Sequence, residues 1–209
     1  MRQFRIQYFL ISFLAIVLLP SCAVKTVSGF KEIKKEGVYE VSYFSDKATD
    51  YVYKAHISIY GKDFGGIFIA KKINDSIYRT AFTTEFGNKL FDFEISDNSF
   101  KVNYILEEMD KKIIVNTLKR DFMLLLKQEH SYDNKYESSG FEVYKSEDNK
   151  RYNYLFLDAE SNRLVKLVNA TKGKEKIEII YVPESSILAR NIVIDHKNIK
   201  LKIELNFIQ

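Results

Sequence analysis

Histidine and cysteine are the side chains of this chain that could act as nucleophiles, general bases or metal ligands near neutral pH, and it has three histidines and one cysteine. His56, His130 and His196 are far apart in the sequence, and none stands in an HExxH spacing or near the cysteine. Cys22 alone can form neither an internal disulfide nor a cysteine cluster for zinc. The sequence therefore predicts no catalytic residue, no metal site and no cofactor, and we interpret each histidine as a solvated strand residue.

The short motifs of phosphate, dinucleotide and serine-hydrolase sites do not occur, because the chain has no P-loop, GxGxxG or GxSxG sequence. We interpret Gly65-Gly66 as a bulge or bend in a curving sheet. The carboxylates Glu107-Glu108, and Asp92 with Glu94, are expected on solvated faces, since 29% of the residues are charged. We therefore expect a protein without enzymatic activity. A hydrolase that uses carboxylates without a recognisable motif is the weaker alternative.

Two arginines lie within apolar segments, where a cation needs a partner. Arg79 and Arg190 could each hold the polar head group of a ligand. Alternatively, each forms a salt bridge on the face of a strand, for Arg79 with a neighbour such as Asp92 or Glu94. We favour the salt bridge.

The first 22 residues have the layout of a signal peptide, with Arg2 and Arg5 before an apolar run from Tyr8 to Leu19. This run of about 12 residues would span roughly 18 Å as a helix, too little for a ~30 Å hydrocarbon core. The segment closes with Leu19-Pro20-Ser21-Cys22, which resembles the bacterial lipobox, although a small residue is commoner at the place of Pro20. We predict a signal peptide over residues 1–21 and lipid attachment at Cys22. The alternative is a buried free thiol after an ordinary cleavage site.

Removal of residues 1–21 would take away Arg2 and Arg5 and no acidic residue, which lowers the formal net charge from +4 to +2. The remaining basic residues alternate with acidic ones, as in Lys31-Glu32, so no single-sign surface suited to nucleic acid is expected. Residues 22–36 are interpreted as an acylated tether that could reach at most ~50 Å at ~3.5 Å per residue. The predicted partner is a membrane.

From residue 37 to the end, the hydrophobic pattern has a period of two, as in Ile199, Leu201 and Ile203 alternating with Lys200 and Lys202. Short turns between the segments indicate antiparallel neighbours. We predict a single mainly β domain, 37–209, with about 11–12 strands in a strongly curved antiparallel sheet. The expected strands are Val38–Ser45, Tyr51–Tyr60, Phe64–Lys72, Ser76–Phe86, Lys89–Ile95, Phe100–Ile105, Phe141–Lys145, Tyr152–Asp158, Arg163–Asn169, Lys176–Val182, Ile187–His196 and Ile199–Phe207.

One helix is predicted between the two series of strands, from about Glu107 to Gln128, where neither glycine nor proline occurs. Ile114, Leu118 and Phe122 share one face, while residues 122–126 are apolar on every side. This helix must be covered on more than one side. It lies either in the concavity of the curved sheet or in an ordinary core.

Several strands carry apolar residues on both faces, for example Phe68 and Ala70 opposite Ile67 and Ile69. A second packed layer, a lipid-filled cavity or a partner protein would each cover the extra face. For the cavity, alternation and aromatic content select six candidate ligand-binding residues. They are Tyr53, Ile57, Phe68, Phe82, Phe93 and Leu125.

The order of an acylated cysteine, six strands, a helix and five or six further strands resembles the outer-membrane lipoprotein carrier family of the LolA and LolB type. The presence of Cys22 makes it more similar to the anchored LolB type. The run from Tyr78 to Phe93 is similar to that of LolB-like lipoproteins from Bacteroidota. The resemblance covers about residues 37–208 and implies an open half-barrel with a helix at its mouth and a carrier or acceptor role.

The preferred hypothesis is a monomeric, non-enzymatic lipoprotein of the bacterial outer membrane, facing the periplasm, that binds acyl chains or lipoproteins in an apolar concavity. Two acyl chains of about 15 methylenes each would lose ~24 kcal/mol of hydrophobic stabilisation in water, so a carrier needs an apolar lining. The main alternative is a structural or assembly lipoprotein of the envelope whose doubly apolar strands bind another protein.

Overall fold

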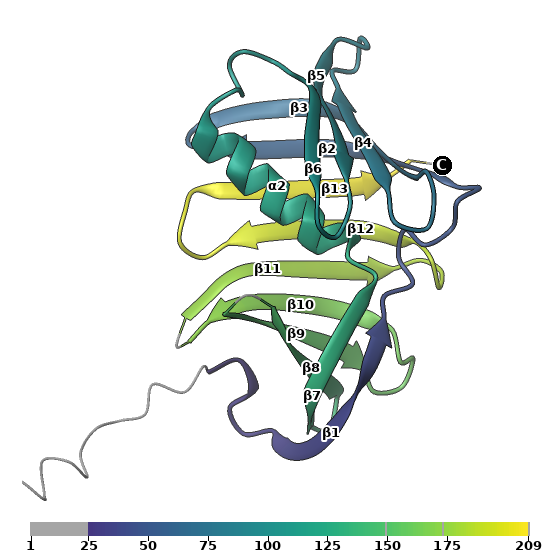
Figure 1. The fold of residues 1–209 in the computed structure, drawn as a ribbon, viewed down its shortest axis with the longest axis vertical. Helices are drawn as coiled ribbons and strands as arrows, with labels where there is room; N and C mark the ends of the chain where they lie inside the picture. Colours follow the sequence, from purple (N-terminus) through teal and green to yellow (C-terminus); the bar gives the residue numbers. More distant parts are fainter. Residues whose placement is uncertain (1–24, 149, 173, 209) are drawn as a thin grey trace, which may run out of the picture.

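The computed structural model describes residues 25–148, 150–172 and 174–208. The predicted signal peptide and Cys22 lie outside these residues. A 3-10 turn, η1 (Lys25–Val27), is followed by six strands, one α-helix and seven further strands, all strands belonging to a single sheet. Figure 1 shows this sheet curving around α2; the first strand of the chain lies beside the seven later strands, and the next five strands form the other part of the sheet.

The bounds of the elements follow the chain in this order: β1 (Lys31–Glu40), β2 (Asp50–Ile59), β3 (Lys62–Lys72), β4 (Tyr78–Thr83), β5 (Lys89–Ile95), β6 (Phe100–Ile105), α2 (Lys112–Leu126), β7 (Glu129–Glu137), β8 (Phe141–Asp148), β9 (Arg151–Asp158), β10 (Leu164–Thr171), β11 (Lys174–Pro183), β12 (Ala189–His196) and β13 (Leu201–Phe207).

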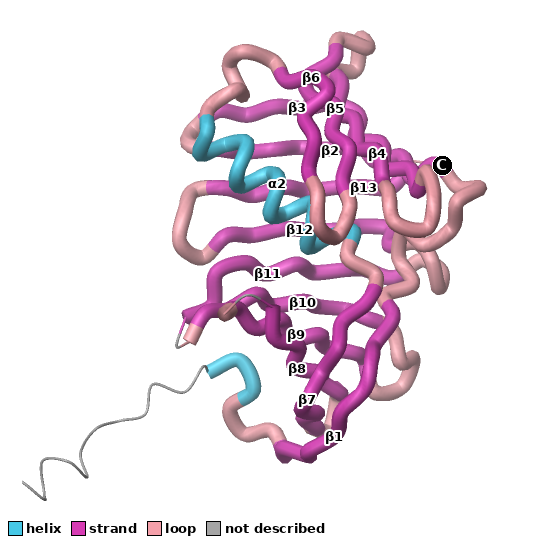
Figure 2. The backbone as a smooth tube through the Cα atoms, viewed as in Figure 1, coloured by secondary structure: helices cyan, strands magenta, loops and turns pink. Residues whose placement is uncertain are grey.

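All neighbouring strands pair antiparallel, in the order β1-β7-β8-β9-β10-β11-β12-β13-β2-β3-β4-β5-β6. Short turns join most neighbours, while β13 pairs with β2 and thereby unites the two series. β1 and β6 stand at opposite ends of the order, so the sheet does not close. The predicted fold class, an open half-barrel of antiparallel strands with one central helix, is confirmed for the described residues (Figure 2).

Two predictions about the elements were wrong. The sheet has 13 strands rather than 11–12, because residues 129–137 form β7, a strand the sequence did not reveal. The first strand begins at Lys31 rather than near Val38, so residues 31–36, expected in the tether, pair with β7 instead. Both strands are rich in charged and polar residues and lack the alternation of aliphatic side chains that marks the other strands.

Gly66 lies where β3 and β4 approach most closely. A Cβ atom at this position would stand 1.9 Å from the carbonyl oxygen of Thr83, whereas one at Gly65 would meet nothing within 4 Å. The register between β2 and β3 runs through both glycines without a shift, so the bulge expected there is absent. The irregularity lies in the next pair, where the β4–β5 register shifts between Phe82 and Thr83. Gly66 thus serves close strand contact rather than a bulge.

The extra apolar face of β9 is covered by the chain itself. Leu155 and Leu157 belong to the main core, while Tyr154 and Phe156 belong to a second, smaller cluster. Phe30, just before β1, packs edge-on against Phe156 with the ring centroids 6.1 Å apart. A second packed layer formed by the amino-terminal segment therefore explains the double pattern of β9, without a lipid or a partner protein.

Candidate functional site

The helix α2 fills the concavity of the sheet, and aromatic contacts fix it there. The ring of Phe122 stacks on that of Phe68 at 5.2 Å between centroids and lies 5.5 Å from Phe91 and 6.4 Å from Phe93. Figure 1 shows the helix lying across the strands on the concave side. The helix was expected either in the concavity of the sheet or in an ordinary core. Both expectations hold, because the concavity around α2 is itself the main core.

The six candidate ligand-binding residues lie together in this core. Each has at most 1% of its surface exposed, and all belong to the cluster that includes Phe122. The hydroxyl group of Tyr53 donates a hydrogen bond of 3.0 Å to the carbonyl oxygen of Ala189. None of the six is a lining residue of the cavities described below or of the small one beside Tyr39 and Tyr43. In this conformation, α2 occupies the space where an acyl chain was expected, and the binding role of the six residues stays a prediction.

A cavity of about 450 Å³ opens at the carboxyl-terminal end of α2. Its apolar wall comes from the end of α2, from the strands β4 and β5, and from Val41, which directly follows β1. A rim of polar residues surrounds it, including Lys72, Asp75 and Asp97. The apolar members are Val41, Tyr78, Ile95, Met123 and Leu126. Since four of these five side chains are also part of the buried core, the cavity borders the core at the end of α2.

A second cavity, of about 360 Å³, lies between α2 and the strands β8, β9 and β10. It is lined mainly by polar side chains, including Arg120 from α2 and Arg151 from β9. Met123 and Asp97 line both cavities, so the two openings are adjacent around the last turns of the helix. Arg120 and Arg151 could not be recognised as neighbours from the sequence, because nothing in it shows that β9 faces α2.

The three histidines occupy different environments. His56 is exposed beside Asp63, with 3.1 Å between Nε2 and Oδ1. His130 and His196 are buried, so the interpretation of each as a solvated strand residue was wrong for these two. His196 contacts Asp121 of α2. No group of three histidine, cysteine or acidic side chains that could hold a metal occurs in the part of the chain that the structure describes.

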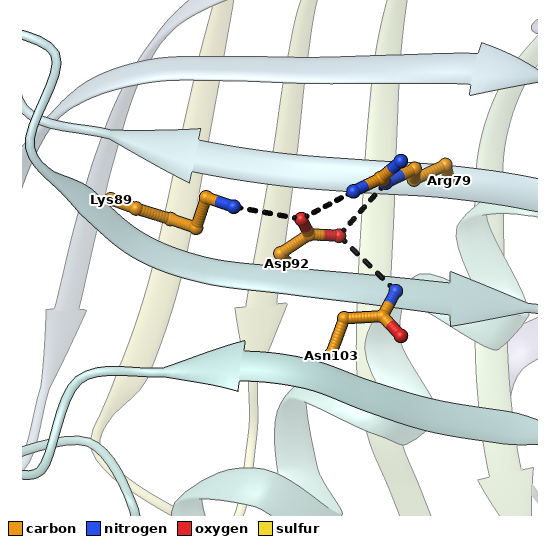
Figure 3. A network of polar contacts seen from close by, with 4 residues as sticks. All are labelled: Arg79, Lys89, Asp92 and Asn103. Carbon is orange, nitrogen blue, oxygen red and sulfur yellow. Dashed lines mark hydrogen bonds and ion pairs between the residues drawn. The ribbon is translucent and has the colours of Figure 1, made fainter.

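Arg79 belongs to a polar network within the sheet, shown in Figure 3. Its Nε and Nη2 atoms donate to the two carboxylate oxygens of Asp92 at 3.0 and 2.8 Å, and Lys89 and Asn103 donate to the same carboxylate. The hydrogen bond from Arg79 is the main cause that holds the pKa of Asp92 well below its usual range. The predicted salt bridge is confirmed. Asp92 is only 2% exposed, however, so the expectation of a solvated carboxylate was wrong.

Arg190 likewise pairs with a carboxylate, that of Glu184. Because both arginines are engaged by acidic neighbours, neither offers a free cation to a ligand in this conformation. Glu107 and Glu108 lie on an exposed surface, as predicted.

The turn between β4 and β5 presents Phe86 to solvent with 93% of its surface exposed. The turn is closed by a hydrogen bond of 2.8 Å from the Thr84 amide to the Asn88 carbonyl oxygen. Within the described residues, no helix is long and apolar enough to span a membrane.

Comparison with known proteins gives little guidance. No family model and no curated protein matches the chain. Among solved structures, it is similar to a provisionally assigned outer membrane lipoprotein-sorting protein domain from Vibrio parahaemolyticus, with a TM-score of 0.44 and 9% identity. The match covers 77% of this chain and 83% of that one. These values are too low to transfer the role of that domain to this chain.

Proposed function

We propose that this protein is a lipoprotein of the bacterial envelope that binds the acyl chains of a lipid or lipoprotein in the concavity now filled by α2. Acylated Cys22 would tether it to the outer membrane on the periplasmic side, and its role would be that of a carrier or acceptor without an enzymatic step. The observation that carries the proposal is that a single inserted helix covers an apolar concave face, chiefly through the contacts of Phe122 with Phe68, Phe91 and Phe93.

An acyl chain can replace these helix contacts because both present apolar surface to the same aromatic side chains. Two acyl chains of about 15 methylenes each lose ~24 kcal/mol of hydrophobic stabilisation when they leave a membrane, and the protein must supply apolar contacts that replace it. Displacing α2 alone would expose the buried faces of Leu118, Phe122 and Leu125 together with the sheet beneath them. When an acyl chain takes the place of the helix, the sheet stays covered and only the apolar face of the helix becomes exposed. Replacement of α2 by an acyl chain is therefore far less unfavourable than displacement of α2 without a ligand.

The cavity at the end of α2 provides a path for the ligand. Its volume of about 450 Å³ lies within the ~300–1,000 Å³ typical of ligand pockets. Met123 and Leu126 form one side of this cavity, so an acyl chain that inserts there contacts the helix first at its last turn. Movement of this turn would open the way from Ile95, which already lines the cavity, toward Phe93.

The test uses residues 23–209, which include every residue that the structure describes and exclude the anchor. After mild purification, native mass spectrometry is expected to detect bound lipid. A photo-crosslinking phenylalanine analogue placed at Phe82, inside the core, should label an added acylated peptide. The same analogue at Val102, which is 40% exposed on β6, is the matched control and should not.

A lipid-free protein with no labelling from Phe82 would remove the acyl-chain proposal. It would leave a role in assembly through contacts with other proteins. Equal labelling from Phe82 and Val102 would indicate binding to the outer surface rather than to the concavity, and would also contradict the proposal.

A further inference from the structure

The cavity between α2 and the second half of the sheet carries an excess of positive charge. Two lysines, two arginines and three asparagines dominate its wall, together with the carboxylates of Asp97 and Asp148. The lysines, arginines and asparagines are Lys119, Arg120, Lys127, Arg151, Asn116, Asn153 and Asn169. Lys127 pairs with Asp148, with 2.9 Å between Nζ and Oδ2. Among the described residues, neither Arg120 nor Arg151 has a carboxylate within ion-pair distance.

Arg120 has a hydrogen-bond donor that the protein leaves unused. Its Nε atom is buried and has no partner among the described residues. A buried donor without an acceptor destabilises the folded state, and this is more pronounced for a charged group. An anion in the adjoining cavity would supply the missing acceptor.

Arg151, by contrast, is held in place by neutral groups. Its Nη1 atom donates to Oδ1 of Asn169 at 2.8 Å, and Nδ2 of Asn169 donates to Oδ1 of Asn153 at 2.6 Å. This buried relay orients the guanidinium without neutralising it. Arg120 and Arg151 line the same cavity, and burial, together with the positive charge of Arg120, lowers the pKa of Arg151.

From this arrangement we propose that the cavity binds a phosphate group, carried by a lipid head group or by a small phosphate ester. Guanidinium groups bind phosphate oxygens through paired hydrogen bonds, and two of them beside lysines match a group with more than one negative charge. A phosphate would satisfy Nε of Arg120 and relieve the repulsion between the two arginines. The site does not depend on acyl-chain binding, although Met123 and Asp97 place it next to the apolar cavity.

The experiment follows the Nε–Hε signals of the arginines by NMR on ¹⁵N-labelled residues 23–209 during titration with three probes. Inorganic phosphate tests the anion alone, dihexanoyl phosphatidic acid tests the lipid head group, and dihexanoylglycerol has the same acyl chains without phosphate. We expect saturable shifts at Arg120 and Arg151 with the first two probes and none with the third. Tighter binding of the phosphatidic acid would identify a lipid as the source, and equal binding would identify the phosphate group itself as sufficient.

Variants assign the binding to this cavity. Arg120→Gln and Arg151→Gln are each expected to weaken phosphate binding by about tenfold or more, the effect of losing a charge-assisted hydrogen bond. Arg190→Gln removes a surface arginine and should leave the affinity unchanged. If Arg151→Gln fails to fold, Arg120→Gln alone tests the proposal. This variant is expected to fold, because Nε of Arg120 contributes no hydrogen bond to the folded state.

The proposal is overturned if neither phosphate probe gives a saturable shift, or if Arg120→Gln binds phosphate as tightly as the unaltered protein. Shifts with dihexanoylglycerol but not with the phosphate probes would support acyl-chain binding while excluding this site. The two proposals can therefore fail independently.

Discussion

His196 Nε2 lies 2.9 Å from both carboxylate oxygens of Asp121, and neither side chain has any exposed surface. The contact joins α2 to the last residue of β12, across 75 positions of sequence. Asp121 lies on the buried face of the helix, near Leu118 and Leu125. It is the polar link within an otherwise apolar contact between helix and sheet.

Loss of either partner should destabilise the fold strongly. Asp121→Ala leaves His196 buried without its acceptor, and breaking a buried pair in this way typically costs about 3–5 kcal/mol. The double substitution Asp121→Leu with His196→Leu should recover most of this loss, because an apolar pair needs no compensation. Urea unfolding at pH 7 measures the free energy of unfolding of each variant. A loss in the double variant equal to the sum of the losses from the two single substitutions would show that the pair is not coupled.

Because His130 is buried, we expect the protein to lose stability in mild acid. Burial lowers the pKa of His130 to about 4, with Lys127 adding to the decrease and Asp148 opposing it. The unfolded chain binds a proton at this residue below about pH 6.5, whereas the folded chain does so only below about 4. Stability should therefore fall as the pH drops from about 6.5 to 4, by about 3 kcal/mol from this group.

The measurement compares urea unfolding of the unaltered protein and of His130→Gln at several pH values between 7 and 4. The difference between the two unfolding free energies isolates His130 from the other titrating groups. This difference should shrink by about 2–3 kcal/mol over the range. A constant difference would mean that His130 is not held neutral in the fold.

Protonation of Asp92 should cause a separate loss of stability at lower pH. Because Arg79, Lys89 and Asn103 hold the pKa of its carboxyl low, the folded state binds the proton less readily than the unfolded chain. Its contribution is present above about pH 4 and is lost as the pH falls below that value. Asp92→Asn should lower the unfolding free energy at pH 7 by about 1–3 kcal/mol and reduce the loss below pH 4.

Glu85→Gln is the matched control for Asp92. Glu85 pairs with Lys54 at 2.9 Å, but both side chains are more than half exposed. Removing such a pair should change the unfolding free energy by less than about 1 kcal/mol. If the two variants lose equal stability, burial of Asp92 does not strengthen its ion pair.

The sequence predicted β5 and β6 with their observed bounds. Short turns delimit both strands, and the apolar residues Phe91, Phe93 and Ile95 recur at every second position of β5. β7 was missed because its buried residues are His130, Lys135 and Tyr136, which do not read as an apolar face. Periodicity detects burial only where the buried side chains are apolar.

The six candidate binding residues were correctly grouped as inward-facing. For the five on strands, alternation shows which side chains share a face, whereas Leu125 lies on the buried face of α2. What alternation could not show was that Phe122 packs against them. The buried polar contacts could not be predicted from the sequence for a different reason. The contacts of Asp121 with His196, and the placement of Arg120 near Arg151, join segments whose proximity depends on the order of strands in the sheet. A charged residue on the apolar face of the predicted helix was the one available signal for Asp121.

The two adjacent glycines of β3 offer a direct test of strand packing. Gly66→Ala would place a Cβ atom 1.9 Å from the backbone oxygen of Thr83, and backbone cannot move as a flexible side chain does. We expect a loss of about 1–3 kcal/mol or more, as for other overpacked sites. Gly65→Ala meets open space and should change the midpoint of thermal unfolding little. A similar effect at both positions would point to strand flexibility rather than to the close approach of β4.

We expect the exposed side chain of Phe86 to contact the membrane. With 93% of its surface exposed at the tip of the β4–β5 turn, this side chain can enter a bilayer without any change in the core. Burying a phenylalanine in an apolar phase is worth about 1.5–3 kcal/mol, or roughly 10- to 100-fold in a partition coefficient. For residues 23–209, Phe86→Ser should weaken sedimentation with phospholipid vesicles by that factor. Ile113→Ser removes another exposed apolar side chain, at the start of α2, and should have no such effect. Equal vesicle binding by the two variants would show that the β4–β5 turn does not contact the membrane.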